Sequence, residues 1–131
     1  MLAHFATVQD WKNWKPNRGE IYLVDLGDGN IDCEQQGLRP FLLISNNIGN
    51  TNGSIVVGCP ISTARKVLPI HVPISSDCGM RFDSYIMTEH IRSISKRRFF
   101  SKGTPILVGV LSEKKTKEVE YAIKLELGLT S

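Results

Sequence analysis

The chain has 131 residues, of which 41% are hydrophobic and 22% are charged, and its formal net charge at pH 7 is +3. This length suits one domain with a single core, and the composition is that of an ordinary globular protein. No apolar run approaches the ~18 residues of a membrane span, and residues 1–16 lack the apolar core of a secretory signal peptide. We therefore expect a cytoplasmic protein.

The three cysteines, Cys33, Cys59 and Cys78, are odd in number and far apart in the sequence. This argues against a disulfide-stabilised secreted domain, and no C-x-x-C pair indicates a zinc site. The sequence also lacks a phosphate-binding loop, a G-x-S-x-G motif, an H-E-x-x-H motif and a carboxylate cluster for two metal ions. We therefore expect free thiols and no metal or other cofactor.

Residues 1–14 look like an addition to the main domain. Apolar residues recur there at every third position, namely Leu2, Phe5, Val8, Trp11 and Trp14. This stripe predicts a short helix that ends before Pro16, because the residue before a proline is disfavoured in a helix. The two tryptophans need burial, either on the main domain or on a partner.

From Gly19 onward the hydrophobic pattern is that of short strands separated by turns. Strands are predicted over residues 21–24, 41–44, 55–61, 68–74, 84–88 and 106–111. A polar, glycine-bearing loop is expected over residues 27–39 and a turn region over residues 46–53. Pro69 and Pro73 predict an edge position for the strand that contains them.

The chain ends in a predicted amphipathic helix. Ser112 is suited to the N-cap, and Gly128 stands where a left-handed C-cap belongs. One face of the helix is apolar and carries Val119, Ala122, Ile123 and Leu127. Five to seven short strands followed by one helix predict a mainly β protein, a small barrel or half-barrel with the helix packed on it.

One segment combines groups that suit a reactive site. Residues 34–40 place an acid, two amides and an arginine just before a buried strand. Pro40 restricts the backbone beside Arg39, and a guanidinium held this way can donate two parallel hydrogen bonds to a phosphate. The alternative is that Arg39 pairs with Glu34 and only braces the loop.

Seven short motifs occur in a fixed order along the chain. They are Arg18-Gly19-Glu20-Ile21-Tyr22, Glu34-Gln35-x-Gly37-x-Arg39-Pro40, Ile48-Gly49-Asn50, Leu68-Pro69-x-His71-Val72, Asp83-Ser84, Glu89-x-Ile91-Arg92-Ser93-Ile94 and Leu125-x-Leu127-Gly128-Leu129. In these motifs and their spacing the sequence resembles the MazF/PemK (Kid-like) toxin family of type II toxin–antitoxin systems. The resemblance covers roughly residues 18–129.

The resemblance implies an SH3-like barrel, a homodimer, a cognate antitoxin protein as partner, and a sequence-specific endoribonuclease (mRNA interferase) that cleaves single-stranded RNA. It divides the chain into a helical extension, residues 1–16, and an endoribonuclease domain, residues 17–131. Because no metal site is evident, we expect the 2′-hydroxyl of the RNA to attack. The products would be a 2′,3′-cyclic phosphate and a 5′-hydroxyl end.

The resemblance also implies catalytic roles. Arg39 falls on the family's catalytic arginine, and Ser62 falls on the position of its catalytic threonine. Thr63 takes that role if the register is shifted by one residue. We expect Arg39 to stabilise the phosphate and Ser62 to bind a non-bridging oxygen, with Glu34 as a candidate base or positioning group.

The remaining candidates are RNA-binding residues, namely Gln35, Thr63, Arg65, Glu89 and His90. The family usually has a glutamine at the position of His90 and a serine at the position of Cys33, and these departures bear on the preferred RNA sequence. His90 has two open interpretations, RNA contact and packing. His71 alternates with its apolar neighbours, which predicts a solvent-facing strand residue rather than a catalytic base.

Two rival functions remain open from the sequence. One is a CcdB-like toxin, which shares this fold but binds gyrase and cleaves nothing. The other is an inactive RNA-binding module that uses only the basic clusters, the largest of which contains Arg92, Lys96, Arg97, Arg98 and Lys102. Such clusters are also compatible with an ordinary solvated face. The motif from Glu34 to Pro40, together with Ser62, favours the nuclease.

Overall fold

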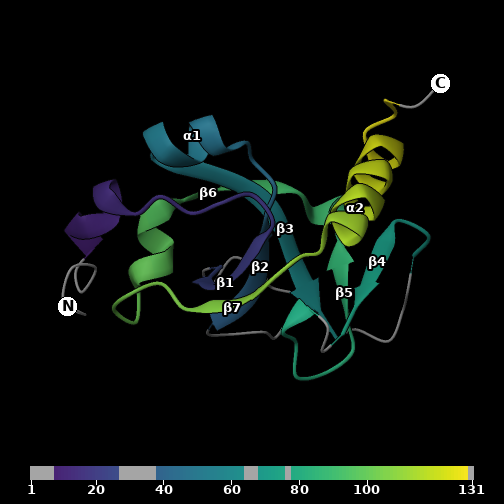
Figure 1. Cartoon of the computed structure of the whole chain (residues 1–131), viewed down its shortest axis with the longest axis horizontal. Helices are drawn as coiled ribbons and strands as arrows, with labels where there is room; N and C mark the ends of the chain where they lie inside the picture. The colour runs from purple at the N-terminus through teal and green to yellow at the C-terminus, as the bar shows by residue number, and fades with distance from the viewer. Residues whose placement is uncertain (1–7, 27–37, 64–67, 76–77, 130–131) are drawn as a thin grey trace.

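The computed structural model describes residues 8–26, 38–63, 68–75 and 78–129, which form one strongly curled antiparallel sheet with a helix at one end (Figure 1). The strands in these residues are β1 (Glu20–Asp25), β2 (Leu38–Leu43), β3 (Ile55–Ser62), β4 (His71–Ile74), β5 (Ser84–Met87), β6 (Arg92–Ser95) and β7 (Leu107–Val110). They are ordered β4-β5-β3-β2-β1-β7, and β6 pairs with β3. This arrangement confirms the predicted mainly β half-barrel with a C-terminal helix.

Strand β3 joins the two halves of the sheet. Its first half pairs with β6, whereas its last two residues, Ile61 and Ser62, pair with β5. Gly58 pairs with Leu43 of β2 and with Arg92 of β6, and a Cβ at this position would be 1.9 Å from the carbonyl oxygen of Leu42. Only glycine therefore permits this close approach of β3 to β2.

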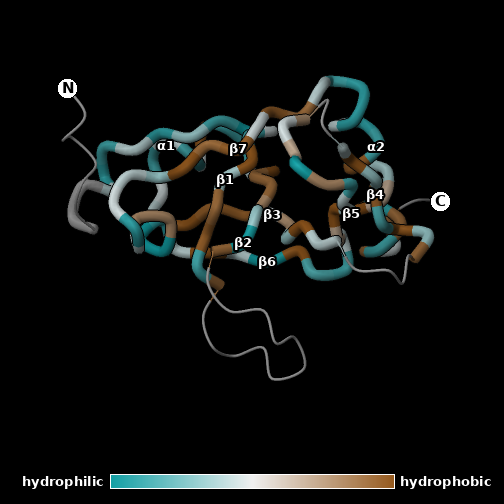
Figure 2. Tube along the Cα trace, turned by 90° about the horizontal axis from the view of Figure 1, so that it is seen from below, coloured by the Kyte–Doolittle hydropathy of each residue, from teal (hydrophilic) through white to brown (hydrophobic). Residues whose placement is uncertain are grey.

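Two hydrophobic clusters fill the curled sheet, and Figure 2 shows β1 and β2 as mostly hydrophobic segments in its interior. One cluster lies beneath α2 (Glu113–Glu126), which contributes Val119 and Ala122. Ser112 caps this helix as predicted, because its Oγ accepts a hydrogen bond from the Lys115 N–H at 3.1 Å. No helix in the described part of the chain is long and apolar enough to cross a membrane.

The second cluster is aromatic and fixes the N-terminal segment. That segment forms a short 3-10 helix, η2 (Val8–Asn13), and then buries Trp14, whose ring centroid lies 5.0 Å from Tyr22 and 4.9 Å from Phe99. Of the two expected alternatives, burial on the main domain or on a partner, Trp14 is thus buried on the main domain. Trp11 stays half-buried, with the Arg97 guanidinium 5.5 Å from its ring centroid.

Lys96 is the first residue of η5 (Lys96–Phe100) and, unlike its basic neighbours Arg97 and Arg98, it is buried. Its side chain is 1% exposed, and its ammonium donates hydrogen bonds to the backbone carbonyls of Trp14 and Asn50. Burial, with a smaller contribution from the charge of Lys15, lowers the pKa of Lys96. Arg97 and Arg98 are exposed, so the cluster is not one continuous solvated face.

Three local predictions were wrong. The turn expected over residues 46–53 contains a short helix, α1 (Asn47–Asn52), because the Asn46 side chain caps it by accepting from the Gly49 N–H at 2.8 Å. Arg39 belongs to β2 rather than to the preceding loop. His71 is buried rather than solvent-facing, because η4 (Thr88–His90) covers that face of β4 and contributes Glu89 as its partner.

Candidate active site

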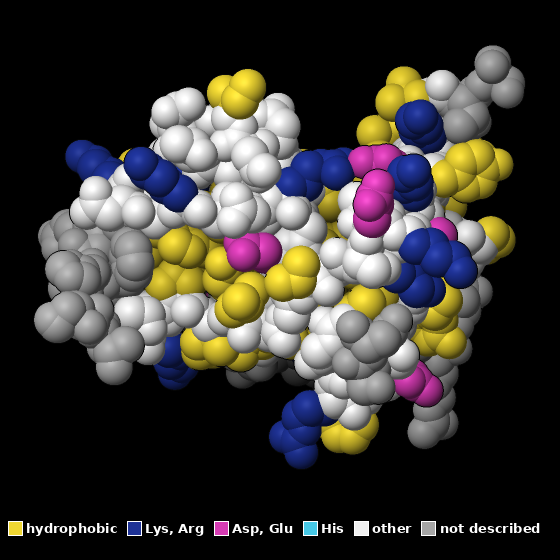
Figure 3. Space-filling view, in the orientation of Figure 1, with side chains coloured by type: hydrophobic (Ala, Val, Ile, Leu, Met, Phe, Trp, Pro, Cys, Tyr) yellow, Lys and Arg dark blue, Asp and Glu magenta, His cyan; other side chains and the backbone are white. Residues whose placement is uncertain are grey.

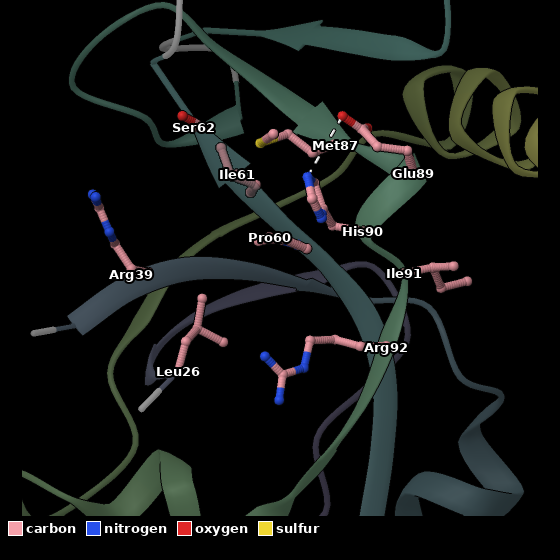
Figure 4. Close-up of a pocket in the computed structure, with 10 residues that line it drawn as sticks. All are labelled: Leu26, Arg39, Pro60, Ile61, Ser62, Met87, Glu89, His90, Ile91 and Arg92. Carbon is pink, nitrogen blue, oxygen red and sulfur yellow. Dashed lines mark ion pairs between the residues drawn. The ribbon is translucent and has the colours of Figure 1, made fainter. Parts of the chain in front are cut away.

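A cavity of about 340 Å³ opens where β2 begins and β3 ends, and Figure 4 shows the ten residues that line it. Its polar side chains come from four elements. Arg39 lies on β2, Ser62 on β3, Glu89 and His90 on η4, and Arg92 on β6. Apolar residues complete the wall, namely Leu26, Pro60, Ile61, Met87 and Ile91. A half-apolar cavity with a few convergent polar groups is typical of a ligand or active site.

The pairing of β2 with β3 explains how this cavity forms. The last paired residues are Phe41 and Pro60, yet both strands continue beyond them. Pro60 has no N–H to donate, and neither has Pro40, so the hydrogen-bonded ladder is weakened at this point. The strands separate there, and the cavity occupies the space between their ends.

The two predicted catalytic residues lie beyond the last pair of β2 with β3. Arg39 precedes the Phe41–Pro60 pair by two residues on β2, Ser62 follows it by two residues on β3, and both line the cavity. Figure 4 shows the two side chains on the same side of the cavity. The arrangement supplies a planar cation and a hydroxyl, which together suit a phosphate.

The structure also distinguishes Ser62 from Thr63 as the candidate catalytic hydroxyl. Ser62 is buried and is the last residue of β3, where it pairs with Tyr85 of β5. Thr63 is exposed, and it is not among the residues that line the cavity. Successive side chains of an extended chain point to opposite faces, so only one of these hydroxyls can face Arg39. This geometry supports Ser62.

The opposite side of the cavity carries an ordered carboxylate. Glu89 Oε2 lies 2.7 Å from the Nε2 atom of His71, and His71 Nδ1 accepts a hydrogen bond from the Leu68 N–H at 3.1 Å. The Nε2 atom of His90 lies 3.7 Å from the same Glu89 oxygen (Figure 4). The His90 side chain is 58% exposed, whereas that of His71 is 4% exposed. His90 therefore faces the cavity, and His71 supports it from behind.

The cavity carries charges of both signs. The guanidinium groups of Arg39 and Arg92 provide positive charge, while Glu89 provides a carboxylate. Cys59 lies beneath this site, where burial and, to a lesser extent, the charge of Glu89 raise the pKa of its thiol to about 12. Because the thiolate is the reactive form of cysteine, Cys59 is not a nucleophile here.

The predicted site residues fall into three groups. Arg39, Ser62, Glu89 and His90 meet at the cavity, and Thr63 lies next to it in sequence but outside its lining. The other three, Glu34, Gln35 and Arg65, lie outside the described residues. Sequence reasoning did not place Arg92 or His71 in the site, although both stand in the matched motifs and that signal could have identified them.

Comparison with known proteins identifies the family. A family described as PemK-like, MazF-like toxin of type II toxin-antitoxin system matches residues 17–127. Endoribonuclease MazF of Staphylococcus saprophyticus is 38% identical over 115 residues, which cover 86% of this chain and 91% of that protein. Endoribonuclease EndoA of Bacillus subtilis is 35% identical over 115 residues, which cover 86% of this chain and 94% of that protein.

Solved structures share the fold. A MazE-MazF crystal structure from Deinococcus radiodurans aligns with a TM-score of 0.72 at 21% identity, covering 89% of this chain and 99% of that one. An endoribonuclease in complex with its cognate antitoxin, from a mycobacterial species, aligns with a TM-score of 0.71 at 24% identity, covering 88% and 98%. The curated relatives confirm the predicted family and the predicted class of enzyme. The chain belongs to the PemK-like, MazF-like toxin family of type II toxin–antitoxin systems.

Proposed function

We propose that this chain is a sequence-specific endoribonuclease that cleaves single-stranded RNA in the cavity around Arg39 and Ser62. The observation that carries the proposal is the separated end of β2 and β3, which brings a guanidinium and a hydroxyl to one side of the cavity. The relatives named Endoribonuclease MazF and Endoribonuclease EndoA support the same activity. An unpaired strand suits the site, because its bases are free to be read on their edges.

In the proposed mechanism the RNA supplies its own nucleophile. The 2′-oxygen forms a bond to phosphorus as its proton is removed, and the bond from phosphorus to the 5′-oxygen breaks as that oxygen gains a proton. Arg39 binds the scissile phosphate and stabilises the charge of the phosphorane, while Ser62 donates a hydrogen bond to a non-bridging oxygen. The products are a 2′,3′-cyclic phosphate and a 5′-hydroxyl end.

The other predicted residues keep their proposed roles. Glu34 is the candidate base or positioning group, although it lies outside the described residues. The proposed RNA contacts are Gln35, Thr63, Arg65, Glu89 and His90. The proposed reaction needs no metal ion, because the 2′-hydroxyl of the RNA attacks in place of a metal-activated water.

The proposal includes the remaining features of the family. Residues 17–131 form the endoribonuclease domain, residues 1–16 are an extension, and the protein acts in the cytoplasm as a homodimer. Exposed apolar residues on the edge strand β7, among them Leu107 and Val110, are suited to contact with a second copy. A cognate antitoxin inhibits the enzyme by placing a segment in the groove near Arg39.

One oligonucleotide tests the activity and the mechanism. It is incubated with pure protein in chelator, once as RNA and once with a single 2′-deoxy substitution 5′ to the scissile phosphate. We expect cleavage of the RNA and none of the substituted strand, while both strands still bind. Loss of activity in chelator, or cleavage of the substituted strand, would mean that water attacks instead. An intact RNA would favour the gyrase-binding or inactive RNA-binding alternative.

The oligomeric state is tested separately by light scattering at micromolar protein concentration. We expect the mass of two chains, because the exposed apolar edge of β7 is unfavourable in water. A monomer mass under these conditions would contradict the dimer.

A further inference from the structure

Among the described residues, only one of the two oxygens of the Glu89 carboxylate has a hydrogen-bond partner. Oε2 meets His71 at 2.7 Å, whereas Oε1 is buried and has no hydrogen-bond donor among the described residues. A buried acceptor without a donor is unfavourable, so native proteins seldom keep one without a functional reason. Glu89 also lines the cavity in which we propose that RNA is cleaved. The missing donor is therefore one that a bound substrate can supply.

His71 decides which oxygen remains without a donor. The Leu68 N–H donates to Nδ1, so in the neutral ring the proton lies on Nε2. Nε2 then donates to Glu89 Oε2, and the ring is held in place because its side chain is only 4% exposed. His71 does not line the cavity. Any effect it has on a substrate must therefore pass through Glu89.

The position of Glu89 favours contact with a base over contact with the reacting phosphate. Figure 4 shows Glu89 across the cavity from Arg39 and Ser62, with the exposed His90 side chain beside it. If Arg39 holds the phosphate, the base of an adjoining nucleotide extends toward Glu89. His90 is the side chain that can move to admit that base, since its ring is 58% exposed and its nearest approach to Glu89 is 3.7 Å.

We propose that His71 is a positioning residue for sequence recognition: it holds Glu89 so that Oε1 accepts a hydrogen bond from the exocyclic amino group of one unpaired RNA base. This inference rests on the proposed function. Carboxylates accept from such amino groups, as with N4 of cytosine. Uracil is disfavoured at this position, because its only edge donor lies between two carbonyl oxygens that would face the carboxylate.

The test is a cleavage profile measured on a randomised RNA pool with the full-length protein, in which the new 5′-hydroxyl ends are sequenced. Wild type should disfavour uracil at one position. In His71→Gln the amide nitrogen reaches the place of Nε2 and keeps the hydrogen bond to Glu89, so the preference should persist. In His71→Asn the shorter amide reaches only the place of Nδ1. The preference at that position should then fall on the order of tenfold.

Glu89→Gln gives an independent readout. An amide presents a donor as well as an acceptor, so this variant should admit uracil at the position that wild type restricts. Kinetics on single oligonucleotides complete the test. His71→Asn should lower kcat/KM for the wild-type sequence, mainly through KM, and should leave kcat on its best sequence close to that of wild type.

Several outcomes would overturn the inference. An unchanged profile in a folded His71→Asn protein would do so, as would equal loss of preference in His71→Asn and His71→Gln, which would indicate packing alone. Uniform slowing of all sequences with a shifted pH–rate profile would make Glu89 a base in the chemistry. If His71→Asn melts far below wild type, an unchanged profile in Glu89→Gln is decisive. Failure of wild type to cleave any RNA would instead refute the proposed function itself.

Discussion

The two ends of the molecule bury charged side chains in opposite ways. At the end that carries the N-terminal segment, the Lys96 ammonium donates hydrogen bonds to the backbone carbonyls of Trp14 and Asn50. These hydrogen bonds join segments that are far apart in the sequence. At the cavity, Glu89 Oε1 lacks a donor among the described residues. A buried polar group that is fully hydrogen-bonded stabilises the fold, whereas one that is incomplete remains available to a ligand.

Surface charge does not follow this division. In the view of Figure 3, Lys and Arg side chains lie both at the end that carries the N-terminal segment and at the α2 end, and the Asp and Glu side chains visible there lie toward the middle and the α2 end. At the end that carries the N-terminal segment, the buried Lys96 instead joins Trp14 and Asn50 in the core. We therefore expect substitutions at the cavity to change catalysis and substitutions around Lys96 to change stability.

The largest catalytic effect should come from Arg39. Arg39→Ala should slow RNA cleavage by a factor on the order of 10³ or more, because the group that stabilises the phosphorane is lost. Arg39→Lys should also be severely impaired, since an ammonium cannot reproduce the bidentate fork. Cleavage rate and melting temperature are measured together. Near-normal cleavage by Arg39→Ala would refute the assignment of the active site. A large fall in melting temperature would contradict the expectation that substitutions at the cavity change catalysis rather than stability.

Ser62→Ala should follow, with cleavage slowed by a factor on the order of 10² to 10³, the usual cost of one preorganised donor. The hydroxyl is small and stands at the end of β3, so thermal unfolding should change little. Single-turnover rates on a short oligonucleotide measure the chemical step. A rate within twofold to threefold of wild type, as for a mere packing residue, would remove Ser62 from the mechanism.

Lys96→Met should show the opposite behaviour. Two buried carbonyls lose their donor, so the free energy of unfolding should fall by about 1–3 kcal/mol, while the sequence preference of cleavage stays that of wild type. The matched control is Arg97→Met, because Arg97 is the next residue and is exposed, and it should change stability by less than about 0.5 kcal/mol. Urea denaturation measures both. Equal effects of the two substitutions on stability would contradict the expectation that the buried Lys96, and not the exposed Arg97, stabilises the fold.

The sequence predicted those features that depend on local pattern. Short runs of apolar residues identified most strands, and the helix cap at Ser112 was recognised from its residue type. Strand β6 was missed because its residues, Arg92–Ser95, are mostly polar and it is held by pairing with β3 rather than by its own hydrophobicity. Pairing partners come from distant parts of the chain, so no local pattern reveals them.

Burial of polar residues was the main feature that the sequence did not predict. Alternation correctly set His71 apart from its apolar neighbours, but it could not reveal that η4 covers the face to which His71 points. Lys96 was grouped with a basic surface because its hydrogen-bond acceptors lie 46 and 82 residues away in the sequence. The family resemblance did identify Arg39 and Ser62 as candidates, and the structure adds that both line one cavity where β2 and β3 no longer pair.

The smallest effect should come from Thr63, which lies just outside the cavity. Its side chain is exposed, and extension of the chain past Ser62 turns it to the other face. Thr63→Ala should therefore slow cleavage by no more than about threefold, equivalent to one weak hydrogen bond of about 0.5 kcal/mol. The same oligonucleotide and conditions as for Ser62→Ala give a direct ratio of the two effects. If Thr63→Ala is the more damaging change, the hydroxyl that faces Arg39 belongs to Thr63, and β3 must shift its register by one residue when RNA binds. The catalytic hydroxyl would then lie one residue further along the chain than the structure of the free protein indicates.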